Sequence, residues 1–250
     1  MSVAVAAVEP AGGGFSLEFV ESVGSRCRGT LATCWAEPFE AVLPVRPFGW
    51  PRGGSSFPVW WWSATTNDHV GFESWLERDH LMLLDFDPDV VGLAAQPFWL
   101  RWHDGVRQRR HAPDFFVRLA DGRGVVIDVR ADDRIEASDA EAFTATATAC
   151  AEVGWLFRRV GVPGAVLVAN VRWLARYRHP RCAGAAAVAD RLVEVFAEPR
   201  PLFGGAAEVG DRIAVLPVLY HLLWRRLLAA DLTSGLLGPS TMVGPAGWSV

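Results

Sequence analysis

The sequence predicts an α/β fold in which a mixed central sheet is flanked by helices and followed by a mainly helical C-terminal domain. Residues 72–84 have the apolar spacing of a helix, and strand-like segments follow them up to residue 130. Two Asp-Gly dipeptides, at 104–105 and 121–122, are typical of turns between paired strands. From residue 183 onward the pattern changes to amphipathic helices. These three observations define the fold class.

The composition limits what kind of protein this is. With 250 residues, of which 51% are hydrophobic, the chain is long enough to bury a substantial core. No apolar run reaches the roughly 18 residues that a membrane span requires, and the first residues lack the basic segment of a secretory signal. The four cysteines have no C-x-x-C spacing and are expected to be reduced thiols. We therefore expect a cytoplasmic protein that does not bind a membrane.

Residues 1–67 form the region that is hardest to interpret, and we expect strands and loops packed on the central domain. Alternating polarity at 15–19 and the segment 28–38 favour two strands, whereas 44–58 is dense in proline and glycine and favours a loop. Val59–Trp62 predicts a short buried strand with core tryptophans. A surface on which nucleic acid bases stack is the less favoured alternative for these tryptophans.

The central domain is expected at residues 68–180. After the helix, strands are expected at 90–94, 98–102, 115–119 and 124–130, followed by a helix at 137–150, a parallel strand at 165–169 and a helix at 171–178. The Asp-Gly turns predict that the four strands form two hairpins of one small antiparallel sheet.

Residues 181–250 are expected to form the C-terminal domain. Helices are predicted at 185–196 and 213–228, with a loop at 199–205 between them. Residues 232–243 favour a short helix or turn and then an extended hairpin. Helices followed by a β ribbon indicate a winged-helix-like domain.

Four side chains in the central domain indicate a phosphodiester-cleaving site. Glu77 lies on the first helix, Asp114 opens the strand at 115–119, and Asp128 and Arg130 project from one face of the next strand. Mg²⁺ prefers oxygen ligands from a few carboxylates, and it can both activate water and neutralise charge on a phosphate. A carboxylate such as Asp128 within an apolar strand is costly unless a metal or a cation pairs with it. The alternative for Asp128 is a salt bridge to an arginine.

Neighbouring polar residues receive lesser roles. Glu73 and His80 share the helix face of Glu77 and are expected to support it or to lie on the surface. His111 has no metal-ligand spacing and stays unassigned. The acids at 132–133 are interpreted as loop residues.

The central quarter of the chain resembles the TnsA-type endonuclease subunit of heteromeric transposases, a family of the PD-(D/E)xK restriction-endonuclease-like superfamily. The matching segments are Leu76-Glu77, Leu83-Leu-Asp-Phe86, Asp89-Val-Val91, Gln96-Pro97, Pro113-Asp-Phe115 and Ile127-Asp-Val-Arg130. On this pattern the family's catalytic glutamate falls on Glu77, its metal-binding aspartate on Asp114, its acidic or amide position on Asp128 and its lysine on Arg130. The resemblance implies that Glu77, Asp114 and Asp128 are the metal ligands.

The resemblance also implies a function. Such a subunit uses Mg²⁺ or Mn²⁺ to nick the 5′ strand at each transposon end during DNA recombination. A DDE-type transposase subunit cuts and joins the 3′ ends, and an ATPase regulator assists. The formal net charge of −4 is consistent with a nuclease that its partners bring to DNA. Within the chain, Arg107, Arg109 and Arg110 are the best candidates for contacts with phosphates.

One residue departs from the family pattern. Arg130 stands where a lysine is expected, and all 24 basic side chains of the chain are arginine. Arginine keeps the positive charge, but its guanidinium cannot carry a proton or act as a point charge as lysine does. The alternative function is therefore a catalytically inactive nuclease-fold subunit that binds DNA ends and transposase partners. A stand-alone restriction or repair nuclease is a third hypothesis.

Overall fold

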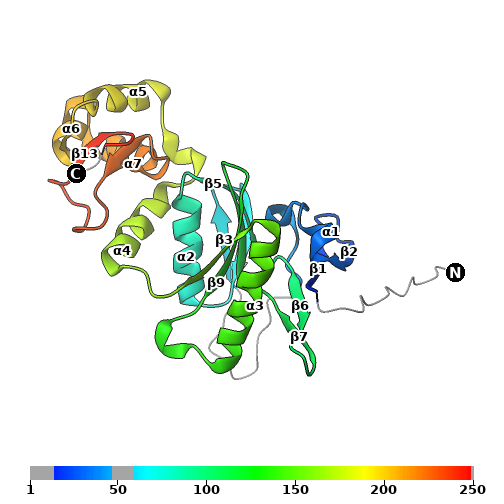
Figure 1. Ribbon diagram of the computed structural model, residues 1–250. Helices are drawn as coiled ribbons and strands as arrows, with labels where there is room; N and C mark the ends of the chain where they lie inside the picture. The colour runs from blue at the N-terminus through cyan, green and yellow to red at the C-terminus, as the bar shows by residue number, and fades with distance from the viewer. Residues whose placement is uncertain (1–13, 47–58, 249–250) are drawn as a thin grey trace. The chain divides into compact units, whose positions relative to one another are not determined.

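The computed structural model describes residues 14–46 and 59–248 (Figure 1). The chain forms two compact units. The first consists of the residues up to 78 together with 89–162, and the second of 79–88 together with 163–250. The boundaries expected at residues 67 and 180 do not coincide with the division between these units. The loop expected at 44–58 lies largely outside the described residues.

A mixed four-stranded sheet forms the centre of the first unit. Its strands are β5 (Val90–Ala95), β8 (Phe115–Leu119), β9 (Gly124–Val129) and β10 (Leu156–Val160), in the order β10-β9-β8-β5. Neighbouring strands are antiparallel except for β9 and β10, which are parallel. The second Asp-Gly turn joins β8 to β9, as the sequence predicts.

Helix α3 (Ala137–Val153) connects the two parallel strands. It begins at a capping box made by Glu136 and Asp139 and ends at Gly154, whose φ of 76° requires a residue without a side chain. The parallel strand expected at 165–169 is wrong, because those residues are helical. The parallel strand is instead β10, whose two adjacent arginines hide its strand character from a search for apolar runs.

A second sheet has the order β2-β1-β6-β7. Its strands are β1 (Ser16–Val20), β2 (Arg26–Thr30), β6 (Trp99–His103) and β7 (Gln108–His111). The expectation that both hairpins belong to one sheet is therefore wrong. The first Asp-Gly turn joins β6 to β7, and β6 pairs with the N-terminal strand β1. Local sequence patterns do not report such a long-range partner.

Aromatic side chains fill the core of the first unit. Phe39, from the 3-10 helix Phe39–Ala41, is fully buried. Its ring centroid lies 5.1 to 5.7 Å from those of four other aromatic residues: Phe19, Phe98, Phe116 and Trp155. Such pairs each contribute about 0.5–1.5 kcal/mol beyond the burial of their area. They fix the N-terminal segment against the central sheet. The short helix α1 (Leu31–Cys34) follows β2 in the same segment.

A separate hairpin precedes the first long helix. Strand β3 (Val59–Ser63) pairs with β4 (Asp68–Phe72). The expected strand at Val59–Trp62 is confirmed, but the expected burial is wrong for Trp60, which is 55% exposed. Alternation along a strand puts neighbouring side chains on opposite faces, so a run of three tryptophans cannot all enter one core.

Helix α2 (Trp75–Phe86) confirms the predicted helix with shifted ends. Phe72, expected inside the helix, closes β4 instead, and Glu73 precedes the first turn. The hydroxyl of Ser74 accepts a hydrogen bond of 3.1 Å from the backbone N–H of Glu77, which satisfies one of the free donors of the first turn.

The second unit contains four further helices. They are α4 (Ala165–Leu174), α5 (Ala186–Val195), α6 (Leu202–Val209) and α7 (Arg212–Trp224), with 3-10 turns at Ala175–Tyr177 and Pro180–Ala183. The loop expected at 199–205 is wrong. Gly205 packs so closely on Phe196 that a Cβ atom there would lie 2.3 Å from its ring, which explains a glycine inside α6.

Three short strands complete the second unit. They are β11 (Arg200–Pro201), β12 (Leu228–Ala230) and β13 (Met242–Pro245), in the order β11-β13-β12. The helix expected as one option after residue 232 is not formed, and an irregular loop joins β12 to β13. From α5 onward the unit therefore reads helix, strand, two helices and then two paired strands.

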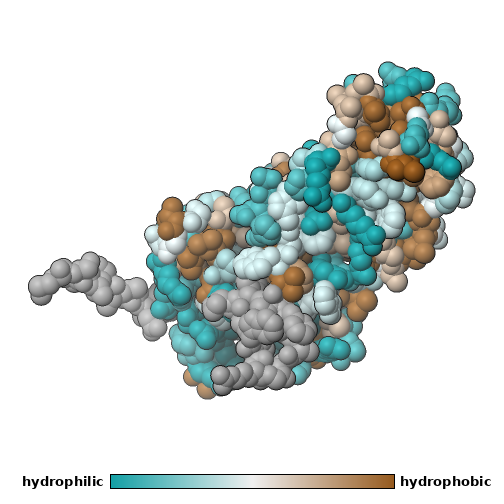
Figure 2. Space-filling model, turned by 180° about the vertical axis from the view of Figure 1, so that it is seen from behind, coloured by the Kyte–Doolittle hydropathy of each residue, from teal (hydrophilic) through white to brown (hydrophobic). Residues whose placement is uncertain are grey.

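In the part of the chain that the structure describes, no helix is long and apolar enough to cross a membrane. On the face shown in Figure 2, hydrophilic and hydrophobic side chains are interspersed over the surface of each unit. The exposed large hydrophobic residues come from many separate elements of the chain.

Candidate active site

Two of the predicted site residues face each other across neighbouring strands. The register that pairs Phe115 with Ile127 places Asp114, just before β8, opposite Asp128 near the end of β9. Opposed residues of an antiparallel pair project from the same face of the sheet, and like charges there are unfavourable. The Oδ2 atom of Asp114 accepts a hydrogen bond of 2.7 Å from the backbone N–H of Val129. The sheet thus brings two carboxyl groups together.

Asp128 is the more deeply buried of the two. The residue is only 2% exposed, and its Oδ1 atom lies 2.8 Å from Nε2 of His111. Its Oδ2 atom has no hydrogen-bond partner among the residues that the structure describes. The arginine salt bridge considered as an alternative is not the arrangement observed, because the partner is a histidine. A buried carboxylate oxygen without a donor is the feature that a bound cation would satisfy.

Asp114 has an unusual protonation equilibrium. Burial raises its pKa well above the ordinary value, and the negative charges of Glu77 and Asp128 raise it further. The hydrogen bond from Val129 and the positive charge of Arg46 act in the opposite direction. Asp114 is therefore the residue whose pKa is affected by both of the other predicted carboxylates.

Glu77 contributes the third carboxylate from the first turn of α2. Its Oε2 atom accepts a hydrogen bond of 2.8 Å from the backbone N–H of Glu73. Burial raises its pKa, the charge of Glu73 adds to this effect, and Arg46 opposes it. Glu73 itself, expected to be a supporting or surface residue, forms an ion pair with Arg46.

The residues fit a divalent cation by their donor chemistry. All three are carboxylates, two of them have raised pKa values, and Asp128 Oδ2 lacks a partner in the described part of the chain. Across residues 14–46 and 59–248, no three His, Cys, Asp or Glu side chains are grouped closely enough to form a ready-made metal centre. One oxygen of each carboxyl group is instead within hydrogen-bonding distance of a protein nitrogen. Mg²⁺ retains several waters and needs few direct protein ligands.

Arg130, at the lysine position, is engaged elsewhere. Its Nε donates a hydrogen bond of 2.9 Å to Oδ2 of Asp139, and its second guanidinium nitrogen lies 2.8 Å from the same atom. Asp139 Oδ2 also accepts the backbone N–H of Glu136, 3.0 Å away, as part of the α3 capping box. Burial raises the pKa of Asp139, but these bonds and the charge of Arg130 lower it below its usual range. Arg130 therefore ties the end of β9 to the start of α3.

His111 and Gln96 lie close to these carboxylates, although the sequence alone assigned no role to either. His111 ends β7, three residues before Asp114, and packs edge-on against the Phe143 ring of α3. Gln96, after β5, has a φ of 46°, and its buried Oε1 atom lacks a partner within the described residues. Its backbone N–H donates to the carbonyl of Asp114 over 2.9 Å. The available signals were the proximity of His111 to Asp114 in sequence and the Gln96-Pro97 pair of the family pattern.

The three arginines expected to contact DNA lie on the β6–β7 hairpin. Arg109 is within ion-pair distance of both Asp104 and Glu141, at 2.5 and 3.0 Å. Arg110 stacks over the ring of Trp99 with its guanidinium carbon 4.3 Å from the centroid. Arg107 is exposed. These residues stay candidates for phosphate contacts, with Arg109 the most restrained of them.

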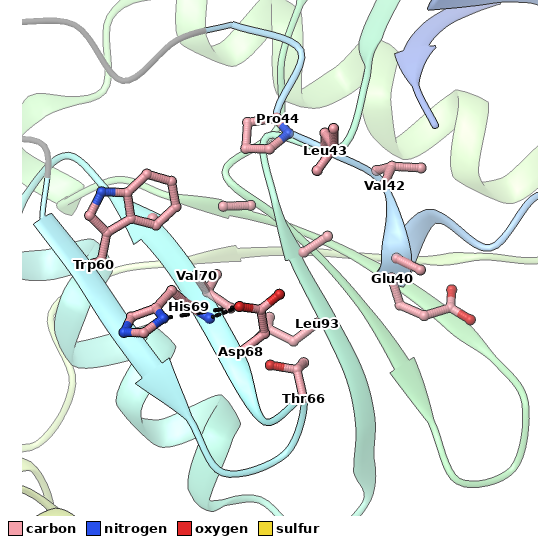
Figure 3. Close-up of a pocket in the computed structure, with 14 residues that line it drawn as sticks. Glu40, Val42, Leu43, Pro44, Trp60, Thr66, Asp68, His69, Val70 and Leu93 are labelled. Carbon is pink, nitrogen blue, oxygen red and sulfur yellow. Dashed lines mark hydrogen bonds and ion pairs between the residues drawn. The ribbon is translucent and has the colours of Figure 1, made fainter. Parts of the chain in front are cut away.

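A pocket of the first unit lies apart from these carboxylates. It has a volume of about 820 Å³ and is formed by residues 40–44, the β3–β4 hairpin and β5 (Figure 3). Trp60 and His69 line one side, and Asp68 accepts the backbone N–H of His69 over 2.6 Å. The charged side chains that line it, Glu40 and Asp68, are acidic, which disfavours a phosphate there.

Comparison with known proteins finds no family model and no curated protein that matches the chain.

Proposed function

We propose that the chain is a metal-dependent DNA endonuclease. The observation that carries the proposal is that the strand register opposes Asp114 to Asp128 and that the charge of Glu77, distant in sequence, acts on Asp114. Mutually repelling carboxyl groups that are partly or fully buried reduce stability, and a divalent cation would convert this cost into binding energy. The mixed sheet with flanking helices is compatible with a restriction-endonuclease-like fold.

More specifically, we propose the TnsA-type subunit of a heteromeric transposase. The combination Leu-Glu, Asp-Val-Val, Gln-Pro and Pro-Asp-Phe is far more specific than a bare pair of acids. The order of elements in the second unit, together with the strand order β11-β13-β12, supports a winged-helix-like domain. The subunit would nick the 5′ strand at transposon ends beside a DDE-type transposase and an ATPase regulator.

The residues divide the work as follows. A bound Mg²⁺ or Mn²⁺ supplies activated water and charge neutralisation. Glu77, Asp114 and Asp128 would hold it, and Asp128 is oriented for this by its contact with His111. The raised pKa of Asp114 means that binding of the cation displaces a proton from this group at acidic pH.

A second function is favoured by the position of Arg130. Because this arginine is bound to Asp139 and the chain contains no lysine, a catalytically inactive subunit that binds DNA ends and transposase partners is the alternative. It would retain the fold and the partner surfaces without cleavage.

One assay separates the two functions. The protein is combined with the transposase encoded beside its gene, and nicking of labelled transposon-end DNA is measured with Mg²⁺ or Mn²⁺. Asp114→Ala abolishes nicking, whereas Arg130→Lys retains or raises it. If the wild-type protein shows no metal-dependent nicking but Arg130→Lys does, the chain is the inactive subunit. The absence of an integrase-type transposase gene nearby would instead favour a stand-alone nuclease.

A further inference from the structure

Arg46 comes from the N-terminal part of the chain, yet its positive charge acts on two of the three carboxylates, Asp114 and Glu77. The backbone N–H of Val45 donates to the carbonyl of Gln96 over 3.0 Å. Gln96 in turn donates its N–H to the carbonyl of Asp114. Arg46 is therefore one residue from a short series of backbone hydrogen bonds that ends at Asp114.

The side chain of Arg46 forms an ion pair with Glu73, the residue whose backbone N–H binds the Glu77 carboxylate. Its two terminal nitrogens lie 3.1 and 2.7 Å from the two carboxylate oxygens of Glu73. Glu73 contacts Glu77 directly, through the hydrogen bond from its backbone N–H to the Glu77 carboxylate. Contacts thus link Arg46 to Asp114 on one side and to Glu77 on the other. Its positive charge lowers the pKa of both.

The geometry of the ion pair leaves room for a second anion. A guanidinium has five N–H donors, and an end-on pair with a carboxylate uses two of them. The edge that contains Nε is left for a phosphate, without loss of the Glu73 contact. The side chain of Arg46 is 38% exposed, so part of it can be approached from solvent. Arg130, in contrast, directs Nε itself at Asp139.

We propose that Arg46, and not Arg130, is the cation that contacts the scissile phosphate. The inference rests on the proposed endonuclease function and names the residue that takes the place of the missing lysine. The ion pair with Glu73 holds Arg46 in position. The ion pair with Asp139 holds Arg130 at the junction of β9 and α3.

The test compares Arg46→Ala with four other variants in the nicking assay described above. Arg46→Ala is expected to lower kcat roughly 100-fold, as removal of one donor to a transition-state charge does, with a smaller change in KM. Arg130→Ala should lose less activity than Arg46→Ala. Arg118→Ala removes a comparable Arg–Glu pair, with Glu40, at the far end of β8 and should nick at the wild-type rate.

Glu73→Gln distinguishes two roles of Arg46: contact with a phosphate, and purely structural stabilisation through its ion pair with Glu73. If Arg46 serves only to hold Glu73, breaking the pair from either side has the same effect. If Arg46 contacts phosphate, Glu73→Gln keeps the cation and one side-chain oxygen that still accepts a hydrogen bond from it, and it retains most of the activity. A binding isotherm for Mn²⁺ gives a readout independent of cleavage: Arg46→Ala should bind the ion several-fold more tightly, because a positive charge next to Glu77 and Asp114 is gone.

The outcomes are distinct. Wild-type protein without metal-dependent nicking rejects the proposed function, and the assignment of Arg46 with it. Wild-type nicking together with unimpaired Arg46→Ala rejects only the assignment. Arg46→Ala and Glu73→Gln could lose nicking activity equally, with matching falls in melting temperature and in Mn²⁺ affinity. This result would show that Arg46 has a structural role only, and it would also reject the assignment. Arg46→Gln, which keeps a long polar side chain, should be as slow as Arg46→Ala while melting near wild type.

Discussion

Replacing Asp128 by asparagine should stabilise the metal-free protein. The amide is nearly the same size, and its oxygen can still accept a hydrogen bond from His111. It removes a charge that is only 2% exposed, lies opposite Asp114 and has one oxygen without a partner in the described structure. Relieving one unsatisfied buried charged group is worth about 2 kcal/mol. For a chain of this size that corresponds to a rise of roughly 4–8 °C in melting temperature.

The same substitution should remove the stabilisation by metal. At a free ion concentration about 100-fold above Kd, binding stabilises the wild type by about 2.7 kcal/mol. Asp128→Asn loses a charged ligand and should gain little. The variant's advantage in melting temperature over the wild type should therefore be smaller in Mn²⁺ than in EDTA, or should be reversed.

The assay is thermal unfolding of both proteins in EDTA and across a series of Mn²⁺ concentrations. Asp121→Asn, in the exposed turn of the same hairpin, is the matched control and should leave the metal response unchanged. A variant that melts below the wild type in EDTA would mean that the Asp128 carboxylate is well satisfied by the protein. A variant that gains as much from Mn²⁺ as the wild type would mean that Asp128 is no ligand. Either result refutes the reasoning.

Three further predictions concern individual side chains. The pKa of Asp114 is raised in the folded protein, so the native state holds a proton that the unfolded chain releases near pH 3.8. Stability in EDTA should therefore fall as the pH rises from about 4 through the raised pKa. Urea unfolding at several pH values should show this slope in the wild type, and an equally steep slope in Asp114→Asn contradicts the assignment. Burial and the charge of Asp128 raise the pKa of Cys150 to about 12, so native protein at about pH 8 should be alkylated at Cys182 well before Cys150. Mass spectrometry of the labelled peptides measures the order, and equal rates would show that Cys150 is accessible as thiolate. The amide of Asn170 donates to the carbonyls of Leu232 and Gly235 and accepts the N–H of Leu237. Asn170→Ala should cost about 3 kcal/mol in unfolding free energy by urea titration, and a change below about 0.5 kcal/mol would show that these bonds contribute no net stability.

Local patterns predicted the elements whose signal lies within one segment. The apolar spacing of α2, the Asp-Gly turns and the alanine-rich α3 are examples, and all three elements form. The failures share a cause. Residues 165–169 satisfy the composition of a buried strand and of a helix equally, and β10 was overlooked because two arginines occupy its exposed positions. Short apolar runs do not distinguish the two structures without knowledge of what packs against them.

At the candidate site, too, some features could be predicted from local sequence and others depended on contacts between distant segments. Glu77, Asp114 and Asp128 were predicted from the sequence because carboxylates lie at the ends of apolar strands and because the segment resembles a nuclease family. The sequence alone assigned no role to His111, Arg46 or Gln96, since their roles depend on hydrogen bonds across strands from different parts of the chain. Arg130 was also expected to face the acids, whereas Asp139 on the following helix binds its guanidinium.

The sequence by itself determined which residue types were available: acids suited to a hard cation, arginine without any lysine, and the helices and strands that carry them. Tertiary structure alone decided which charges meet. The strand register placed Asp128 opposite Asp114, and a long-range ion pair placed Arg46 beside Glu73. The cause is that the pKa and the binding partners of a charged group depend on its burial and on its neighbours in space. Neither of these follows from its position along the chain.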